Sequence, residues 1–439
     1  MLVTYDTVRA DHLGSYGYPL DITPTADSLA ERGMVFENVW APMGMTLPSH
    51  ATMMSGVSPR VHGALENLYP MSKKVLTLAE VFTQKKYATG AFVGAAVLNQ
   101  GTGIEQGFRK YGQPNLGEAN GSEVTEGLLR RSAKMVNESA LRWIRNLPPD
   151  HNYFLWVHYY DPHGPFDPPE EIVQKLRDEG LVEFVVDPRR HEFENEPIKA
   201  NYLESLWSHY AGDVRMTDLE LGQLLAKLDS AGRLKDTWIV LTSDHGEGLW
   251  EHGERGHGPT LFEEQLRVPL IIVAPDGQHA GRRFEEPIQL TDLMPTLLHA
   301  AFDERIETGP GTDLLAWIDD GSKPLNRPIF VERPHYSAKG IFSIRGQYPD
   351  RYKYGIQAAV ILDGQKFVLY PDGSGELYDL ALDPSEIQDI AASQPETAAR
   401  LRVLLEDYLA ENPTAPPGTR PEVSEERRAA LEQLGYTGE

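Results

Sequence analysis

The chain has 439 residues, with 65 Asp or Glu against 41 Lys or Arg and a formal net charge of −24. This length favours one large domain with a smaller appendage, and the acidic balance argues against non-specific binding to nucleic-acid phosphates. The sequence has no cysteine, which excludes disulfides, thiolate catalysis and cysteine-ligated zinc.

The sequence gives little information on membrane attachment or on the cellular compartment of the protein. No apolar run is long enough to cross a bilayer, and no signal peptide is recognisable. The chain opens almost directly on a predicted strand, "MLVTYD", and this start is compatible with a lost upstream leader. The compartment is therefore left undecided, with the periplasm and secretion both open, and nothing indicates the oligomeric state.

Short, continuously apolar runs alternate with helical patterns along the chain, and such runs are typical of strands buried on both faces. The predicted strands are residues 1–6, 153–160, 237–244 and 268–275. The predicted helices are residues 25–33, with Thr25 as N-cap and Gly33 at the end, 122–147 and 198–232. This alternation predicts an α/β fold with a large, mostly parallel sheet between helices.

The character of the sequence changes near residue 310. Short strand patterns, "PIFVE", "KFVLY" and "GELYDL", precede a predicted helix around 394–411. We therefore expect a catalytic α/β domain over 1–310, an α+β subdomain over 311–411, and a proline-rich linker with a short docking helix over 412–439. The polar, proline-punctuated stretch 166–199 is expected to be a lid or a surface insertion.

Metal-type ligands follow three of the predicted strands. Asp6 ends the first, Asp161 and His163 follow the second, and Asp244 and His245 follow the third. In a parallel α/β sheet, ligands bind outside the carboxyl ends of the strands, so carboxylates and imidazoles at this edge indicate a divalent cation. Capping remains an alternative for Asp6 or Asp161 alone, whereas the stretch "SDHGEGLWEHGERGHG" is hard to explain by packing.

A threonine stands at the start of another predicted helix, in "TLPSHATMMSG". Pro48 suits a first helical turn, which places Thr46 just before the N-terminus, where free N–H groups favour an anion. A hydroxyl between this helix end and a divalent cation would have its alkoxide stabilised. The alternative is that Thr46 and Ser49 only cap the helix.

Several long blocks of the sequence resemble the sulfatase family of the alkaline-phosphatase superfamily. The first runs from "YDTVRADHLGSYGY" to "TLPSHATMMSGVSPRVHG", and the second from "HYAGDVRMTDLELG" to "SDHGEGLWEHGERGHG" and "RVPLIIVAP". "IQLTDLMPTLLHAA" and "ELYDLALDPSE" resemble later blocks. Because the resemblance covers most of the chain, it is far more specific than any single motif.

The resemblance implies a role for each matching residue. Asp6, Asp244 and His245 would be metal ligands, and Thr46 falls at the position of the nucleophile, which also contacts the metal. His163 resembles the histidine near the leaving-group oxygen.

His257 falls where many family members carry a lysine that contacts the transferred group. His50 stands where sulfatases have an arginine, and we expect it to contact the substrate or orient Thr46. The sequence thus departs from the family pattern at both positions, replacing a fixed cation by an imidazole.

The sequence also departs from the family pattern at the nucleophile and in two other motifs. Sulfatases have a cysteine or serine there that is oxidised to formylglycine, and Thr46 cannot become this aldehyde. The second acid of the first motif is Thr7, and the family's Lys-Trp-His stretch has no counterpart in residues 91–100. The chain therefore resembles the threonine-type phospho-transferring relatives, which include phosphodiesterases and phosphoglycerol and phosphoethanolamine transferases.

These observations predict a metal-dependent hydrolase of small anionic esters, acting on phosphodiesters or phosphonate monoesters through a phosphorylated Thr46. His163 and His257 would orient the substrate or protonate the leaving oxygen. One divalent cation is expected, Mg²⁺, Ca²⁺, Mn²⁺ or Zn²⁺, although two remain possible if Asp161, His163 and His257 bind a second.

Three other functions stay open at this point. They are a sulfatase that works without formylglycine, a transferase that passes the phospho group to an alcohol, and a non-catalytic member that binds an anion. His62 and His252 lie beside glycines, and each is either a further site residue or a residue that only holds a turn. The first-motif residues Arg9, Asp11 and His12 are expected to support the strand-to-helix turn.

Overall fold

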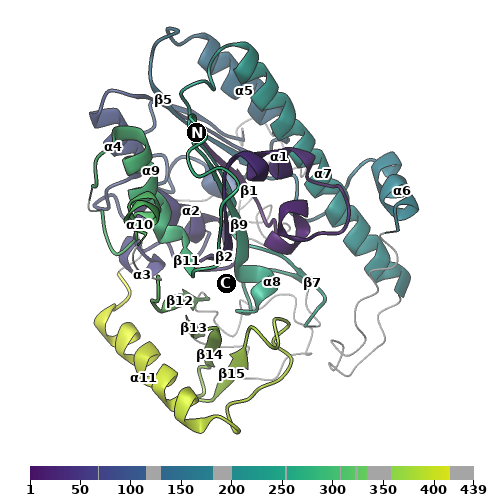
Figure 1. Cartoon of the computed structure of the whole chain (residues 1–439), viewed down its shortest axis with the longest axis vertical. Coiled ribbons are helices and arrows are strands. Elements are labelled where there is room, and N and C mark those ends of the chain that lie inside the picture. Colours follow the sequence, from purple (N-terminus) through teal and green to yellow (C-terminus); the bar gives the residue numbers. More distant parts are fainter. Residues whose placement is uncertain are drawn as a thin grey trace, which may run out of the picture.

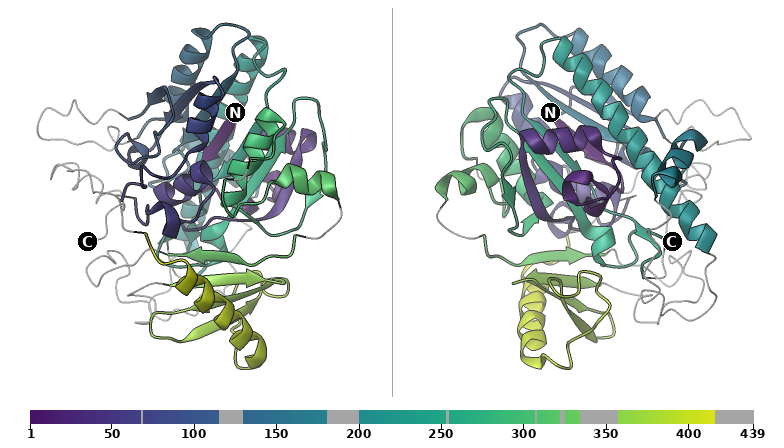
Figure 2. Two further views of the ribbon diagram at one scale, coloured as in Figure 1. Left: turned by 90° about the vertical axis from the view of Figure 1, so that its left-hand side faces the viewer. Right: turned by 45° about the vertical axis from the view of Figure 1, so that its right-hand side comes forward.

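The computed structural model describes residues 1–67, 69–114, 130–180, 200–252, 255–306, 308–321, 325–333 and 357–415. Five predicted segments lie partly outside these ranges, namely the helices 122–147 and 198–232, the stretch 166–199, the subdomain 311–411 and the proline-rich linker. The predicted docking helix lies wholly outside them. Within the described ranges, a large unit of sheet and helices stands above a smaller α+β unit (Figures 1 and 2).

A nine-stranded sheet forms the centre of the large unit, in the order β10-β2-β9-β6-β1-β5-β3-β4, with β11 also paired to β2. The strands are β1 (Leu2–Tyr5), β2 (Met34–Trp40), β3 (Ala88–Val93), β4 (Lys110–Gly112), β5 (Tyr153–Tyr159), β6 (Ile239–Ser243), β9 (Arg267–Val273), β10 (Arg283–Phe284) and β11 (Ile288–Gln289). Only β9 runs antiparallel to its neighbours, β2 and β6. The predicted mostly parallel α/β fold is confirmed.

Helices cover both faces of this sheet (Figures 1 and 2). One face carries α1 (Pro24–Arg32), α5 (Ala133–Arg145) and α7 (Ala200–Ser230), and the other carries α2 (Thr46–Ser55), α4 (Leu78–Gln84), α9 (Leu293–Phe302) and α10 (Leu314–Asp320). In β1, Leu2 packs into one layer and Val3 and Tyr5 into the other. The strand runs are continuously apolar because both faces are buried.

Shorter elements lie around this framework. They are α3 (Pro59–His62), α6 (Glu170–Asp178), α8 (Glu263–Leu266) and a two-stranded hairpin of β7 (Gly248–Leu249) and β8 (Arg255–Gly256). The helix α6 lies within the predicted insertion 166–199, and residues 181–199 are outside the described part of the chain.

The smaller unit is an antiparallel sheet with one helix against it (Figure 2). Its strands, β12 (Ile329–Glu332), β13 (Ala358–Leu362), β14 (Gln365–Leu369) and β15 (Gly375–Asp379), pair in chain order, and α11 (Pro395–Glu411) packs on one face. The other face contributes Ala359, Ile361 and Val368 to the core of the large unit. The helix α10, which follows the predicted domain boundary at 310, packs against α9 of the large unit.

The start of α1 depends on a residue far away in the sequence. The helix begins at Pro24 after Thr23, so the expected N-cap, Thr25, already lies inside the first turn, and Thr23 makes no side-chain cap bond. Instead, the Asp218 carboxylate on α7 accepts hydrogen bonds from Thr25 N at 2.7 Å and Ala26 N at 2.9 Å. Asp218 on α7 therefore caps the N-terminus of α1. Burial raises the pKa of Asp218 to about 6.

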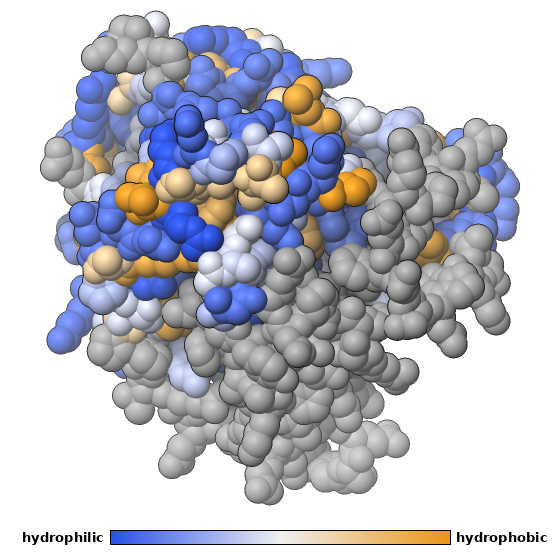
Figure 3. Space-filling view, turned by 90° about the horizontal axis from the view of Figure 1, so that it is seen from below, coloured by the Kyte–Doolittle hydropathy of each residue, from blue (hydrophilic) through white to orange (hydrophobic). Residues whose placement is uncertain are grey.

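The described surface seen from below is mostly hydrophilic, with small and separate hydrophobic groups among the coloured residues (Figure 3). Among the described helices, none combines the length and apolar character needed to span a bilayer.

Replacing Asp218 by alanine tests this remote cap. We expect D218A to lower the free energy of unfolding by about 2 kcal/mol, because it leaves the first N–H groups of α1 without acceptors. Urea unfolding followed by circular dichroism measures this loss. The matched control is D229A, which removes an exposed carboxylate from the same helix and should change stability by less than about 0.5 kcal/mol; equal losses would contradict the assignment.

Candidate active site

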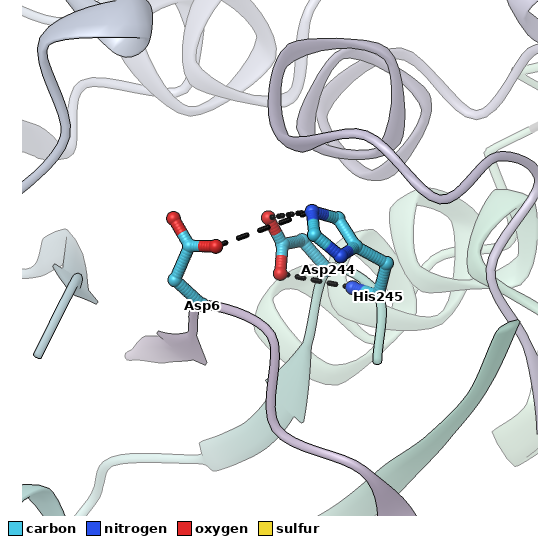
Figure 4. A group of neighbouring side chains, drawn as sticks. All are labelled: Asp6, Asp244 and His245. Carbon is cyan, nitrogen blue, oxygen red and sulfur yellow. Dashed lines mark hydrogen bonds and ion pairs between the residues drawn. The ribbon is translucent and has the colours of Figure 1, made fainter. Parts of the chain in front are cut away.

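The site forms where three adjacent strands end. In the sheet register, Tyr5 of β1 lies opposite Tyr159 of β5 and Ser243 of β6. The residues that follow β1 and β6, Asp6 and the Asp244–His245 pair, therefore emerge side by side at one edge (Figure 4). This is the carboxyl edge of the parallel strands, where α/β proteins bind ligands.

The structure brings four of the predicted site residues together at this edge. The His245 Nε2 atom lies 3.5 Å from Asp244 Oδ2 and 4.0 Å from Asp6 Oδ1, and it lies 3.4 Å from Thr46 Oγ1. All four residues are fully buried. The two carboxylates and the imidazole offer ligand atoms within 4.8 Å of one another.

The two carboxylates fit a divalent cation because three of their four oxygens have no hydrogen-bond donor. Neither oxygen of Asp6, nor Oδ2 of Asp244, has a hydrogen-bond partner, although all three are buried. Such atoms are costly in a protein interior unless a cation satisfies them. Burial raises the pKa of both carboxyl groups, and the nearby negative charges of Asp244 and Glu247 raise the pKa of Asp6 further.

His245 is oriented to donate a lone pair to the same point. Its Nδ1 atom donates to the Gly246 carbonyl at 2.9 Å, so Nε2 carries the lone pair in the neutral ring. Burial holds the pKa of His245 well below its usual value. The ring is therefore neutral and available as a metal ligand.

Asp244 is fixed by backbone donors, one of which the sequence did not reveal. Its Oδ1 atom accepts from Thr7 N at 3.2 Å and from its neighbour His245 N at 2.9 Å. Thr7 has φ of 58°, a left-handed conformation that is unusual for a β-branched residue, and its hydroxyl donates to Pro162 O at 3.1 Å. Thr7, which stands where the family has its second acid, thus holds the Asp244 carboxylate through its backbone N–H group.

Thr46 is the first residue of α2, one position further into the helix than predicted, and Met45 is the N-cap residue. Ser49 Oγ donates to the Met43 carbonyl at 2.7 Å and caps nothing. Pro48 does lie in the first turn, as the sequence predicted. The Thr46 hydroxyl therefore faces His245 rather than the helix amides.

A chain of hydrogen bonds behind Thr46 fixes two histidine tautomers. His50 Nδ1 lies 2.8 Å from the Thr46 carbonyl, which can only accept, so His50 Nε2 must accept from the Thr4 hydroxyl at 3.1 Å. Thr4 Oγ1 also accepts from Trp156 Nε1 at 3.0 Å. Because the Thr4 hydroxyl has already donated its one proton to His50, its oxygen must accept a second hydrogen bond, from His158 Nδ1 at 3.3 Å. Both nitrogens of His50 are thus engaged with protein atoms, and its contact with a substrate stays a prediction.

His158 is a site residue that the sequence analysis missed. It is the second-to-last residue of β5, and its Nε2 atom is 3.3 Å from Asp6 Oδ2. Burial keeps the pKa of His158 well below its usual value, so the ring is neutral. Because Nδ1 donates to Thr4, Nε2 carries the lone pair and faces Asp6 Oδ2. The available signal was a histidine inside an otherwise apolar strand run, "YFLWVHYY".

The two remaining predicted histidines lie next to His245. The ring centroid of His257 is 4.3 Å from that of His245 and 5.0 Å from that of His163. His257 Nδ1 contacts Glu247 Oε1 at 3.1 Å, and His163 Nδ1 contacts the Tyr160 hydroxyl at 2.9 Å. Burial lowers the pKa of His163 to about 3 and that of His257 to about 4, so both rings are neutral near pH 7.

Asp161 lies apart from this cluster. Its Oδ2 atom accepts from Ala133 N at 2.8 Å, in the first turn of α5. Within the described ranges, the one group of three potential metal ligands is Asp6, Asp244 and His245. A second ion bound through Asp161 therefore finds no support in this arrangement.

Other candidate residues have structural partners. His62 contacts the Thr52 hydroxyl at 3.0 Å and accepts from Ala64 N at 3.1 Å. Arg9 pairs with the carboxylates of Asp11 and Glu251. These contacts hold the turns around the site.

His252 also has a structural partner. It stacks on Phe262, with ring centroids 3.6 Å apart, and bonds Glu264 at 2.7 Å. Burial alone would lower the pKa of His252, but the Glu264 carboxylate outweighs it and raises the pKa to about 8.

Comparisons with known proteins identify the family and the fold of this chain. The sequence model of the Sulfatase family matches residues 1–303. An uncharacterized sulfatase of Escherichia coli, YidJ, is 26% identical over 428 residues, which cover 89% of this chain and 82% of that protein. The phosphonate monoester hydrolase of Agrobacterium radiobacter has a similar structure, with a TM-score of 0.70, 21% identity, and coverage of 94% of this chain and 95% of that chain.

A further solved structure of the same fold contains its substrate, D-glucosamine-2-N,6-O-disulfate. It has a TM-score of 0.74 and 18% identity, and the match covers 95% of this chain and 98% of that chain. The two solved structures share the fold of this chain, while the family match spans 303 of its 439 residues.

Removing one carboxylate should abolish cation binding. We expect D244A to weaken the binding of Mn²⁺ or Zn²⁺ by at least about 100-fold, because it takes away a ligand and its charge. Equilibrium dialysis with elemental analysis measures this, and the rise in melting temperature on adding metal should vanish as well. The control D161N, whose carboxylate caps α5, should bind like the wild type; full metal content in D244A would refute the site.

The His252–Glu264 pair should make stability depend on pH. Because the folded pKa of about 8 exceeds the usual 6.5, the pair stabilises the fold below pH 6.5, and this stabilisation is lost as pH rises through 8. The difference in unfolding free energy between wild type and H252Q should therefore shrink by about 2 kcal/mol from pH 6 to pH 9. Urea titrations at several pH values test this, and a pH-independent difference would contradict it.

Proposed function

Because this chain belongs to the sulfatase family and is an ester hydrolase, we propose that it hydrolyses phosphodiesters or phosphonate monoesters with Thr46 as its nucleophile. The observation that carries the proposal is the buried contact of Thr46 Oγ1 with His245 Nε2, beside two carboxylates of whose four oxygens three have no hydrogen-bond donor. The side chain at this position cannot form formylglycine, and the chain has no cysteine elsewhere. The hydroxyl itself is therefore the available nucleophile.

The residues at the strand edge have separate roles in this reaction. Asp6, Asp244 and His245 would hold one divalent cation with Thr46 as a further ligand, and this ion would stabilise the Thr46 alkoxide and the charge on the non-bridging oxygens. Thr46 Oγ1 forms a bond to phosphorus while the bond to the ester oxygen breaks. The proton lost by Thr46 balances the one gained by the leaving alcohol, and we assign His163 the role of orienting that group.

The choice of phosphate over sulfate rests on the second half of the reaction. A formylglycine hydrate releases sulfate by collapsing to the aldehyde, whereas an adduct on threonine needs a second displacement at the transferred atom. Metal-assisted in-line attack by water resolves a phospho-threonine more readily. Charge adds a weaker argument, because His50 and His257 replace two fixed cations and both have lowered pKa values. A pocket with fewer cations suits a monoanionic diester better than a phosphate monoester.

The donor set limits the identity of the cation. Two carboxylates and a hydroxyl suit Mg²⁺, Ca²⁺ or Mn²⁺, while one imidazole nitrogen also admits Zn²⁺. The mixed set favours Mn²⁺ or Zn²⁺ as the first ions to test.

Hydrolysis of sulfate esters is the second candidate function. It is favoured by the family match and by the structural neighbour that contains a disulfated glucosamine as its substrate. A sulfate ester carries one negative charge, so charge alone does not separate it from a phosphodiester.

A comparison of aryl esters tests the choice between these functions. On metal-loaded protein we expect kcat/KM for the phosphodiester and the phosphonate monoester to exceed that for the sulfate ester by at least about 10-fold, with the phosphate monoester also below them. Release of the aryl alcohol, followed by absorbance, measures all four substrates. A sulfate ester at the top of the series would instead support the second candidate.

The nucleophile has its own test. T46A should lose at least about 1,000-fold in kcat while it keeps its metal and its melting temperature, because the covalent step is removed. T46S retains a hydroxyl and is the matched control, expected to stay within about 10-fold of wild type. Activity that survives in T46A would show that Thr46 is not the nucleophile.

A further inference from the structure

A cavity on the outer edge of the large sheet gathers positive charge. It has a volume of about 910 Å³ and lies between α5 and β4, the last strand at one end of the sheet. Lys110, Arg131 and Arg142 line it, and none of the described residues around it is acidic. Because the whole chain has a formal net charge of −24, these three cations create a local field that attracts anions to an otherwise acidic protein.

This cavity is separate from the candidate active site. In the sheet order β4 is the third strand from β1, and a strand spacing of about 4.8 Å places the two strands about 14 Å apart. Asp6, Asp244 and His245 do not line the cavity. A ligand held here therefore leaves the cation site free, and its binding does not depend on the proposed reaction.

Two glycines bring large side chains directly against the edge of the sheet. A Cβ atom at Gly90 of β3 would lie 2.8 Å from the Trp143 ring, and one at Gly112 of β4 would lie 3.3 Å from Arg131 Nη1. The indole and the guanidinium therefore occupy the space that side chains at these two positions would need. The absence of a side chain at Gly112 is what allows a charged group to lie over the edge strand.

Arg131 is held at its backbone and on one side of its guanidinium. Its backbone N–H group donates to Gly94 O at 2.9 Å, and its Nη2 atom donates to Met135 O at 2.9 Å and to Ser139 Oγ at 2.5 Å. Its Nη1 atom is buried and has no hydrogen-bond partner in the described part of the chain. A buried donor of this kind is costly unless an acceptor meets it, so Nη1 marks the position of an anion.

Two further cations lie beside this guanidinium. Arg142 follows Ser139 by three residues on α5, so the two side chains are neighbours on one face of the helix. Lys110 lies on the same face of β4 as Gly112, because the two residues are two positions apart in one strand. Among the described residues, neither Lys110 nor Arg142 has an ion-pair partner. All three basic groups are therefore available to one ligand.

The same cavity also contains a buried acceptor. Asn99 is one of its lining residues and is only 3% exposed. Its Nδ2 atom donates to Pro114 O at 3.3 Å, and because that carbonyl can only accept, the orientation of the amide is fixed. Its Oδ1 atom is buried and, within the described ranges, has no donor. A ligand that completes this site must therefore provide a proton donor as well as negative charge.

We propose that the cavity between β4 and α5 binds an anionic sugar, whose carboxylate, sulfate or phosphate group pairs with Arg131 and whose hydroxyl group donates to Asn99 Oδ1. The guanidinium presents two parallel N–H groups that match two oxygens of such an anion. Lys110 and Arg142 add charge at the mouth of the cavity, where both side chains are exposed. The volume lies within the usual range of small-molecule sites.

Other occupants satisfy only part of this arrangement. A free sulfate ion can accept from Arg131 but has no proton for Asn99 Oδ1, and a neutral sugar leaves the three cations unpaired. A nucleic acid offers both groups, but its phosphate chain would meet the negative field of a protein with a formal net charge of −24. A small anionic sugar fits the donor, the acceptor and the charge together.

Isothermal titration calorimetry on full-length, metal-loaded protein tests this assignment. The probes are glucuronate, glucose 6-sulfate and glucose 6-phosphate, which carry the three anionic groups on similar sugars. Glucose and the sulfate ion are the controls for the sugar and for the charge. The order of the three Kd values identifies the anionic group that the cavity prefers.

We expect R131Q to raise the Kd of each sugar anion by at least about 10-fold, because it removes a charge-assisted donor. R142Q changes an exposed side chain and should raise the Kd about 3-fold at an unchanged melting temperature. The matched control is R145Q, an exposed arginine of the same helix outside the cavity, which should stay within about 2-fold of the wild type. N99A should weaken the sugar anions about 5-fold and leave the affinity for the sulfate ion unchanged.

D244A separates this cavity from the active site. Because D244A is expected to lose the cation, a sugar anion bound at the strand edge should lose affinity, whereas one bound between β4 and α5 should not. We expect the Kd of glucuronate in D244A to stay within about 2-fold of the wild-type value, since distant sites act independently.

Several results would overturn the inference. They are no heat of binding for any sugar anion up to about 10 mM, equal effects of R131Q and R145Q, or equal affinities for glucose and glucuronate. Binding that D244A abolishes and R131Q leaves intact would place the ligand at the active site. A sulfate ion that binds as tightly as glucose 6-sulfate would remove the sugar from the assignment, and tighter Arg131-dependent binding of a single-stranded oligonucleotide would replace it by a nucleic acid. If R131Q fails to fold, R142Q and N99A decide the question by the same criteria.

Discussion

Two buried carboxylates placed side by side are the constraint on which the site depends. Asp6 and Asp244 leave the ends of strands that are separated by no other strand, and three of their four oxygens have no hydrogen-bond donor. Without a compensating cation, this arrangement would cost several kcal/mol in a protein interior. Backbone amides hold only one oxygen of Asp244. Its other oxygen and Oδ1 of Asp6 both lie within 4.0 Å of His245 Nε2. The geometry favours a divalent cation over any other occupant.

Neutral imidazoles surround the two carboxylates. Burial lowers the pKa of His50, His158, His245 and His257, so the rings supply lone pairs and hydrogen bonds rather than positive charge. The Trp156 indole, which can only donate, begins a chain through Thr4 that fixes two of the tautomers. A pocket of this kind would rely on a cation for charge compensation. This is the reason for proposing a substrate with a single negative charge.

The fold was largely predictable where burial left a pattern in the sequence. Strands covered by helices on both faces are continuously apolar, so residues 153–160 and 237–244 could be located within one or two residues of β5 and β6. The direction of β9 was not predictable, because an apolar run reads the same in either orientation. The cap of α1 was placed on Thr25 although Asp218 of α7 supplies it. Thr25 and Asp218 are 193 residues apart in the sequence. The sequence pattern around Thr25 therefore could not predict their contact.

The sequence by itself determined the fold class, the family resemblance and the identity of the metal-type residues Asp6, Asp244 and His245, because ligand chemistry is a property of residue type and of position after a strand. Only the tertiary structure decided which groups meet. It turned Asp161 toward α5 and away from the cluster, brought His158 against Asp6, and set Glu247 opposite His257 across a hairpin. The reason is physical: strand register and side-chain direction are fixed by packing between segments far apart in the chain, and a hydrogen bond exists only once both partners have been placed.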